Sequence, residues 1–181
     1  MIAFGAIFAL WLVLAAYWVH AVWAMPAIAG KWKWWREIAL RLGFFALVLL
    51  LLRLAIYRHV LPQAPAYAFN TDRVCGLVGT LLCALGIALA ILGRAWLGRS
   101  GGTLVTTGPY AWLRHPIYAG MLLAVLGSAI AQSALWLLPL MAYGPALICS
   151  ARREERRLSE RFPERYPAYM KRTGMLLPFV L

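Results

Sequence analysis

Acidic residues are scarce in this sequence, and several long stretches carry no charged residue at all. The 181 residues include only 6 Asp and Glu against 18 Lys and Arg, and 64% of them are hydrophobic. Its length is that of one domain, but so little charge between long apolar runs is not the composition of a soluble one. The composition therefore predicts an integral membrane protein.

Cysteine is equally scarce and follows no recognisable pattern. Cys75, Cys83 and Cys149 all fall within apolar runs, and no two of them show CxxC spacing. Neither a metal site nor a disulfide framework has this distribution, so we expect no metal centre and no disulfide. The three residues are interpreted as small apolar core residues.

The apolar runs set the predicted fold. A helix that crosses about 30 Å of bilayer needs about 20 apolar residues. Residues 2–24, Ile38–Ile56 and Val74–Leu92 are three such runs, and Pro116–Leu147 is a longer one, broken at Ala131–Ser133, that we interpret as an antiparallel helical hairpin. The first run has no basic residues before it and no cleavage pattern after it, so we do not expect a signal peptide. The prediction is an all-α integral membrane protein with about five transmembrane helices.

The distribution of Lys and Arg predicts the topology. With the N-terminus outside, 15 of the 18 basic residues fall on the cytoplasmic side and three outside. This is the positive-inside bias, so we expect the N-terminus outside and the C-terminus in the cytoplasm. Topology and an anionic inner leaflet account for the net charge of +12, and a nucleic-acid partner is not expected.

Small residues and prolines predict local packing. Gly76, Gly79 and Gly86 lie in the third apolar run, where they would let a neighbouring helix approach closely. Pro139 and Pro145 lie in the last run and predict a kink or an interruption there.

One polar stretch stands out before the hairpin, residues 108–120, with the sequence GPYAWLRHPIYAG. Pro116 suits the first position of a helix because its missing N–H costs nothing there. The residue before a proline is turned away from helical geometry, so we expect His115 at the helix cap. A helix N-terminus attracts anions, so the stretch is either part of a binding site or only a basic anchor with a helix start.

A second polar segment follows the hairpin and begins with Glu154 and Glu155. In a basic helix these two residues could simply balance charge with arginines three positions away. A solvated amphipathic helix does not require the aromatic residues and the proline that follow, namely Phe162, Tyr166, Tyr169 and Pro178. The hairpin brings both polar segments to the same membrane face, so we expect a single site built from both.

Together the two segments resemble the isoprenylcysteine carboxyl methyltransferase family, whose wider group includes phospholipid N-methyltransferases. The resemblance rests on GPY-x3-RHP-x-Y-x-G, then an apolar hairpin, then EE-x2-L-x3-F-x3-Y-x2-Y, and it covers about residues 97–181. It implies one membrane methyltransferase domain over residues 1–181, with three helices in 1–93. Residues 94–181 would hold a cofactor-binding segment, the hairpin and a C-terminal lid at the cytoplasmic face.

The resemblance also implies S-adenosylmethionine (SAM) as the cofactor and assigns residues to two sets. The cofactor-binding set is Gly108, Pro109, Tyr110, His115, Pro116, Tyr118, Glu154 and Glu155. The acceptor-facing set is Tyr166, Tyr169 and Arg172. Carboxylates suit the amino and sulfonium charges of this cofactor, and a helix N-terminus suits its carboxylate.

Methyl transfer to a lipophilic acceptor, a lipid or prenylated amphiphile, is the implied activity. The favoured acceptor is a carboxylate of the isoprenylcysteine kind, which is already ionised and would be held by Arg172 or, as second choice, by Arg114. An amine acceptor, as in phospholipid N-methylation, would instead need His115 or a glutamate such as Glu155 to accept a proton.

Two other functions fit parts of the pattern. A steroid-reductase-like membrane enzyme that uses NADPH shares the helical layout and an RHP-x-Y-like motif, and a membrane scaffold without catalysis would need only the helices. The paired glutamates and the tyrosines that follow them favour the methyltransferase.

Overall fold

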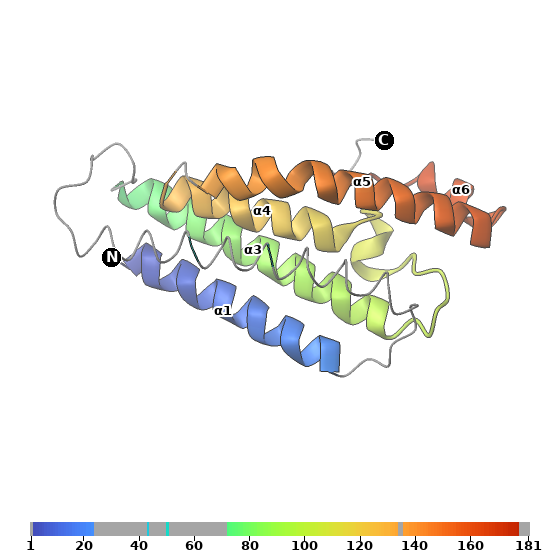
Figure 1. Ribbon diagram of the computed structural model, residues 1–181, viewed down its shortest axis with the longest axis horizontal. Helices are drawn as coiled ribbons and strands as arrows, with labels where there is room; N and C mark the ends of the chain where they lie inside the picture. Colours follow the sequence, from blue (N-terminus) through green and yellow to red (C-terminus); the bar gives the residue numbers. More distant parts are fainter. Residues whose placement is uncertain (1, 24–42, 44–49, 51–71, 134–135, 178–181) are drawn as a thin grey trace.

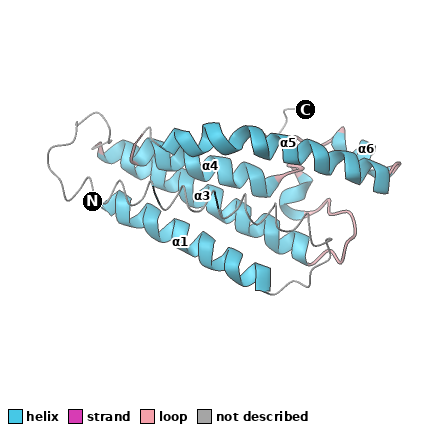
Figure 2. Ribbon diagram, in the orientation of Figure 1, coloured by secondary structure: helices cyan, strands magenta, loops and turns pink. Residues whose placement is uncertain are grey.

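The chain folds into a bundle of helices packed side by side (Figure 1). The computed structural model describes residues 2–23, 43, 50, 72–133 and 136–177, and within these ranges every element is helical (Figure 2). In chain order the elements are α1 (Ile2–Trp23), α3 (Arg73–Gly98), the 3-10 helix η2 (Gly108–Ala111), α4 (Pro116–Ala131), α5 (Leu137–Arg161) and α6 (Arg165–Met170). The predicted all-α class is confirmed for this part of the chain.

Two of the described helices have the length and composition of a membrane span. They are α1, over Ala3–Ala21, and the whole of α3, whereas α4 is apolar but only 16 residues long. The predicted second span, Ile38–Ile56, lies outside the described residues except for Gly43 and Leu50. The total of five spans and the orientation of the chain across the membrane therefore stay predictions.

Glycines bring α3 and α4 into backbone contact. A Cβ atom built on Gly86 would lie 2.5 Å from the nitrogen of Ala124, and one on Gly127 would lie 2.4 Å from the nitrogen of Cys83. Real Cβ atoms do not approach a backbone this closely, so only glycine fits at these positions. The close approach predicted from Gly79 and Gly86 is confirmed, while Gly76 faces α1, with its Cβ position 3.4 Å from that of Ala3.

The predicted hairpin is present as α4 and α5, joined through the segment after Ala131. α5 runs without interruption from Leu137 to Arg161, so of the two predicted effects of its prolines the interruption is wrong, and the kink stays a prediction. Pro139 lies in the first turn, where no hydrogen bond is lost, and Pro145 is accommodated inside the helix.

Aromatic and polar side chains fasten α1 to this hairpin. The ring of Trp11 stacks on that of Trp136, with centroids 5.6 Å apart, and the Trp11 indole N–H donates to the Ser128 hydroxyl at 3.0 Å. Trp136 in turn donates to the side-chain oxygen of Gln132 at 2.9 Å. These contacts hold α1 against the ends of α4 and α5 that lie far from the polar motifs.

The close contact of α3 and α4 predicts the effect of adding a single methyl group. Gly86→Ala and Gly127→Ala should each lower stability by about 1–3 kcal/mol, because the new Cβ overpacks the contact, even though alanine is the better helix former. Thermal unfolding in detergent measures the change.

Gly5→Ala and Gly144→Ala are the matched controls, since a Cβ at either glycine would meet no atom within 4 Å in the described structure. Both controls should leave stability unchanged or slightly raised. Equal destabilisation by all four substitutions would contradict the close helix contact.

Candidate functional site

The first polar motif forms a turn that leads into α4. Gly108 opens η2 with φ 61°, and a Cβ there would lie 2.4 Å from the indole of Trp96, so this position requires glycine for both reasons. His115 is the N-cap of α4 and Pro116 is its first residue, as the sequence predicts. The His115 ring is buried and stacks almost parallel on the ring of Tyr118, with centroids 5.5 Å apart.

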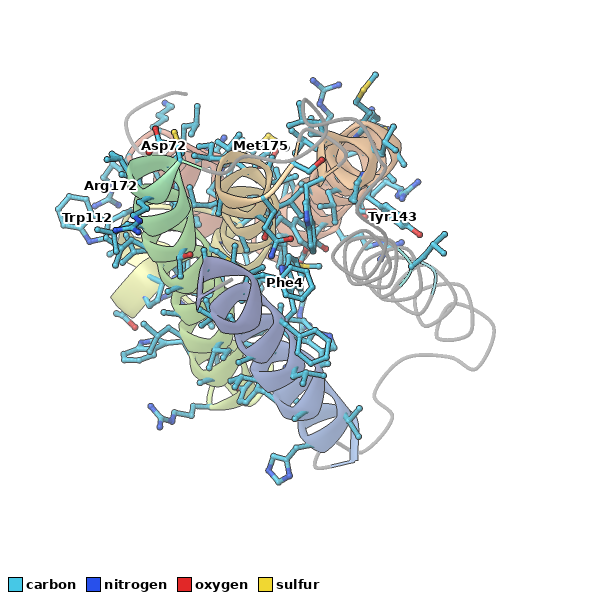
Figure 3. The ribbon with its side chains drawn as sticks, turned by 90° about the vertical axis from the view of Figure 1, so that its left-hand side faces the viewer. Phe4, Asp72, Trp112, Tyr143, Arg172 and Met175 are labelled. Atoms are coloured by element: carbon cyan, nitrogen blue, oxygen red, sulfur yellow. The ribbon has the colours of Figure 1, made fainter. Side chains whose placement is uncertain are left out.

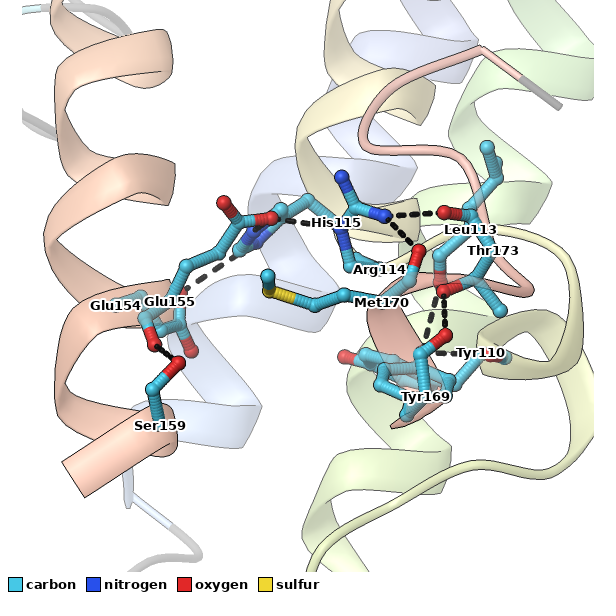
Figure 4. Close-up of polar contacts among 10 residues, drawn as sticks. All are labelled: Tyr110, Leu113, Arg114, His115, Glu154, Glu155, Ser159, Tyr169, Met170 and Thr173. Carbon is cyan, nitrogen blue, oxygen red and sulfur yellow. Dashed lines mark hydrogen bonds and ion pairs between the residues drawn. The ribbon is translucent and has the colours of Figure 1, made fainter. Parts of the chain in front are cut away.

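Both glutamates of the second motif face this histidine. An oxygen of Glu154 lies 3.7 Å from His115 Nδ1, and Glu155 Oε1 lies 3.5 Å from His115 Nε2. The antiparallel course of α4 and α5 produces this arrangement, since the start of α4 lies beside the second half of α5 (Figure 4). The prediction that the hairpin brings the two motifs together is confirmed for these three residues.

The Nε2 atom of His115 is buried but makes no hydrogen bond among the described residues. Its approach to Glu155 is long, because the same carboxylate oxygen accepts a shorter bond of 2.7 Å from Arg114 Nε. A buried nitrogen left without a partner costs about 1–3 kcal/mol. Such an atom, beside two carboxylates, indicates a place where a ligand completes the hydrogen bonding.

Arg114 ties the turn to α5 and to the segment after α6. Besides Glu155, its guanidinium donates to the carbonyl of Met170 at 2.8 Å and to that of Thr173. Its backbone N–H donates to the carbonyl of Gly174 at 2.8 Å. The Arg114 side chain thus donates to three acceptors and clamps these segments together, and its second-choice role in holding an acceptor stays a prediction.

The chain after α6 lies as a strap along the residues before α4. Residues 112–115 and 174–175 exchange three backbone hydrogen bonds, and Leu113 pairs with Gly174 in a parallel bridge. The Tyr169 hydroxyl donates to the carbonyl of Tyr110 at 2.7 Å, and the Thr173 hydroxyl donates to that of Tyr169 at 2.9 Å. This strap packs on the turn at Tyr110, and the C-terminal lid that the resemblance implies for this part of the chain stays a prediction.

Burial favours the neutral forms of His115 and of three tyrosines at the site. Burial lowers the pKa of His115, with the adjacent Arg114 cation adding to the effect and the Glu155 carboxylate opposing it. Burial also raises the pKa of Tyr110 and of Tyr166, in both cases with a glutamate nearby, and raises that of Tyr169 to about 12. At neutral pH the site therefore presents an uncharged imidazole and uncharged phenols next to two carboxylates.

Arg172, the first choice for holding an acceptor, lies apart from this cluster. It is exposed, its Nε donates to the carbonyl of Ala168 in α6, and it lines a hollow together with Tyr169. Figure 3 shows it on the side of the bundle away from Tyr143 of α5. A second hollow, a groove of about 470 Å³, lies beside Glu155 and Met170 and is also lined by Arg152, Arg156, Ser159 and Glu160.

Sequence reasoning missed several residues that build the site. Trp96 packs under Gly108, and Thr173 and Gly174 form the strap that Arg114 binds. The contacts of Arg114 with Thr173 and Gly174 join residues about 60 positions apart, and no spacing in the sequence predicts them. The one sequence signal for this part of the site is the set of aromatic residues before Thr173, namely Phe162, Tyr166 and Tyr169, which indicated that this end of the chain packs on the rest of the protein.

Comparisons with known proteins match the part of the chain that holds the two motifs. The family model described as phospholipid methyltransferase matches residues 74–165, which is just over half of the chain. This range includes the turn before α4 and both glutamates, and it ends where α6 begins.

Two curated relatives match over 101 residues, or 52% of this chain. They are the cobalt-zinc-cadmium resistance protein CzcN of Cupriavidus metallidurans, 40% identical, and the nickel-cobalt-cadmium resistance protein NccN of Alcaligenes xylosoxydans xylosoxydans, 36% identical. The match covers 46% of the first protein and 47% of the second, so the chain spans about half the length of these relatives.

The family match therefore falls on α3, η2, α4 and α5, the elements that place Arg114 and His115 beside the paired glutamates. By this match, the chain belongs to the phospholipid methyltransferase family.

Proposed function

We propose that this chain transfers a methyl group from SAM to a lipophilic acceptor at the surface of a membrane. The observation that carries the proposal is the buried Nε2 of His115, which makes no hydrogen bond among the described residues and lies 3.5 Å from Glu155, with Glu154 near the other ring nitrogen. Family membership supports SAM as the cofactor, and the apolar helices α1 and α3 support an acceptor that enters from the membrane.

The residues of the site fit this cofactor. Glu154 and Glu155 supply negative charge for its ammonium and sulfonium cations, and His115 supplies the buried nitrogen that lacks a partner. The ring of Tyr118, stacked on His115, gives a flat apolar surface beside them. When bound, SAM supplies an electrophilic methyl group on a sulfonium centre.

The protein's own contribution is to hold the reactants in place and to exclude water. The transfer needs the acceptor atom in line with the methyl group at about 3 Å, and positioning of this kind accounts for a large part of a rate enhancement. The strap fixes the turn through Tyr169 and Thr173, and Arg114 fixes Glu155. A site with these restraints keeps its carboxylates and its imidazole oriented before the reactants arrive.

A carboxylate acceptor of the isoprenylcysteine kind remains our first proposal for the reacting group, since it needs no base. One observation favours an amine as the second candidate. An amine must lose a proton before or during transfer, and a neutral imidazole can accept it. Burial lowers the pKa of His115 and so keeps its imidazole neutral.

Membranes that contain the purified chain, supplied with SAM labelled in its methyl group, test the proposed activity. The label should pass into the fraction that organic solvent extracts. Mild base should then release it as volatile methanol if the product is a methyl ester, whereas a methylamine keeps its methyl group on nitrogen. Label that stays in the aqueous phase under all conditions would count against a lipophilic acceptor.

Removal of one site charge should weaken cofactor binding. Glu154→Gln keeps the shape of the side chain but loses its charge, so affinity for the demethylated product S-adenosylhomocysteine should fall about tenfold. Calorimetric titration in detergent measures this change. Glu164→Gln, an exposed glutamate just before α6, is the control and should bind normally; equal losses in the two variants would contradict the assigned site.

Acid should weaken cofactor binding through His115. The folded-state pKa of this group is lowered below its ordinary value of 6.5, so the ring is neutral at pH 7 and becomes positively charged only as the pH falls below that value. A positive ring between Glu154 and Glu155, with Arg114 already beside it, repels a cationic ligand, and affinity for SAM should fall from pH 7 toward pH 5.

His115→Gln removes the titrating group and should flatten this part of the pH profile. The same linkage makes the wild-type protein lose stability relative to His115→Gln as the pH falls below 6.5, because the unfolded chain binds the proton more readily. An unchanged binding profile in His115→Gln would show that another group is responsible.

A further inference from the structure

The groove of about 470 Å³ between α5 and α6 reaches the candidate site at Glu155. One of its lining residues, Met170, belongs to α6, and the others belong to α5. Steps of three and four positions link these α5 residues, which places them on one face of the helix. They are Arg152, Glu155, Arg156, Ser159 and Glu160. A groove of this volume is within the range of small-molecule sites, so it can hold one end of a ligand whose other end lies near His115.

Two arginines in the wall of this groove are available to bind an anion. Arg152 and Arg156 are exposed, and neither side chain makes a hydrogen bond or an ion pair within the described part of the chain. The two residues are four positions apart, so their side chains are neighbours on the helix and their like charges repel. An anion held between the two guanidinium groups offsets this repulsion.

The carboxylate beside these arginines is held from the buried side of the helix. Glu155 Oε1 accepts from Arg114 Nε at 2.7 Å, so this carboxylate is engaged with the turn before α4 rather than with Arg152 or Arg156. Glu155 also lines the groove. The groove therefore presents a fixed negative charge next to two positive charges that have no partner of their own among the described residues.

The start of α4 is the other place where an anion could bind, and the strap covers part of it. The backbone N–H of His115 donates to the carbonyl of Met175 at 3.2 Å, and Pro116, the next residue, has no N–H. The strap thus uses a donor that an anion at this end of the helix would need. The two arginines of the groove make no such contact with the strap.

We propose that the groove holds the amino-acid end of SAM, with the carboxylate at Arg152 and Arg156 and the ammonium at Glu155. Both groups are attached to one carbon atom of the cofactor, and neighbouring positions of α5 offer the two matching charges. Guanidinium groups bind carboxylates through charge-assisted hydrogen bonds. Glu154, which does not line the groove, is then left for the sulfonium centre. The inference rests on the proposed function, and it makes the two arginines the residues that select a ligand with an intact amino-acid end.

Two ligands that differ only in the carboxylate test this assignment by calorimetric titration of the full chain in detergent. They are S-adenosylhomocysteine and its decarboxylated form, which keeps the amine. The wild-type protein should bind S-adenosylhomocysteine about tenfold more tightly, the difference expected for charge-assisted hydrogen bonds. Arg152→Gln/Arg156→Gln should lose this preference, because its affinity for S-adenosylhomocysteine falls about tenfold while its affinity for the decarboxylated form changes less than about twofold.

Arg153→Gln/Arg157→Gln is the matched control. It removes the same charge from exposed positions of α5 that do not line the groove. This variant should keep the wild-type preference for the carboxylate, with both affinities changed less than about twofold. All four arginines are exposed, so both double variants should fold like the wild type, and equal midpoints of thermal unfolding in detergent check this.

The outcomes separate this inference from the proposed function. Loss of the carboxylate preference in Arg152→Gln/Arg156→Gln but not in the control would support the groove as the site of the amino-acid end. Tight binding of S-adenosylhomocysteine without a carboxylate preference in the wild type, or equal losses in the two double variants, would overturn the groove site and leave the proposed function standing. A wild-type protein that binds neither ligand would overturn both.

Discussion

The candidate site depends on one buried guanidinium group. Arg114 lies in the turn before α4 and donates to Glu155 on α5 and to the carbonyls of Met170 and Thr173 beyond α6. These groups are 41 to 59 positions away along the sequence, and a planar guanidinium with five donors can reach several of them from one place. Arg114 makes the short bond to Glu155, while His115 Nε2 lies 3.5 Å from the same oxygen and makes no hydrogen bond among the described residues, so this atom is where a ligand would complete the bonding.

The helices supply a rigid support for that turn. α3 and α4 are in backbone contact at Gly86 and Gly127. This contact fixes the position of α4 along α3, and with it the position of His115 at the start of α4. α1 is fastened at the other end of the hairpin by Trp11. The second half of α5 and α6 lie at one end of the bundle (Figure 1). The charged residues of α5 belong to this second half, so the site lies outside the most apolar part of the fold.

Local patterns predicted much of this arrangement. A proline at the first position of a helix placed His115 at its cap, glycines in an apolar run predicted a close helix contact, and the hairpin predicted that Glu154 and Glu155 would meet the histidine. Two kinds of structural detail could not be predicted from the sequence. The hydrogen bonds of Arg114 depend on how the strap folds back, and the continuous course of α5 through Pro145 depends on packing that overrides the local preference of proline. The methyl acceptor is a proposal because substrate choice depends on the shape and chemistry of a binding site, which no sequence motif specifies.

The most direct test of the account is calorimetric titration of the purified full chain with S-adenosylhomocysteine and, separately, with NADPH. Saturable binding of one S-adenosylhomocysteine per chain, with no heat from NADPH, is the result that a methyltransferase site at His115, Glu154 and Glu155 predicts. Binding of NADPH without binding of S-adenosylhomocysteine would contradict it and would favour a reductase built on a similar turn.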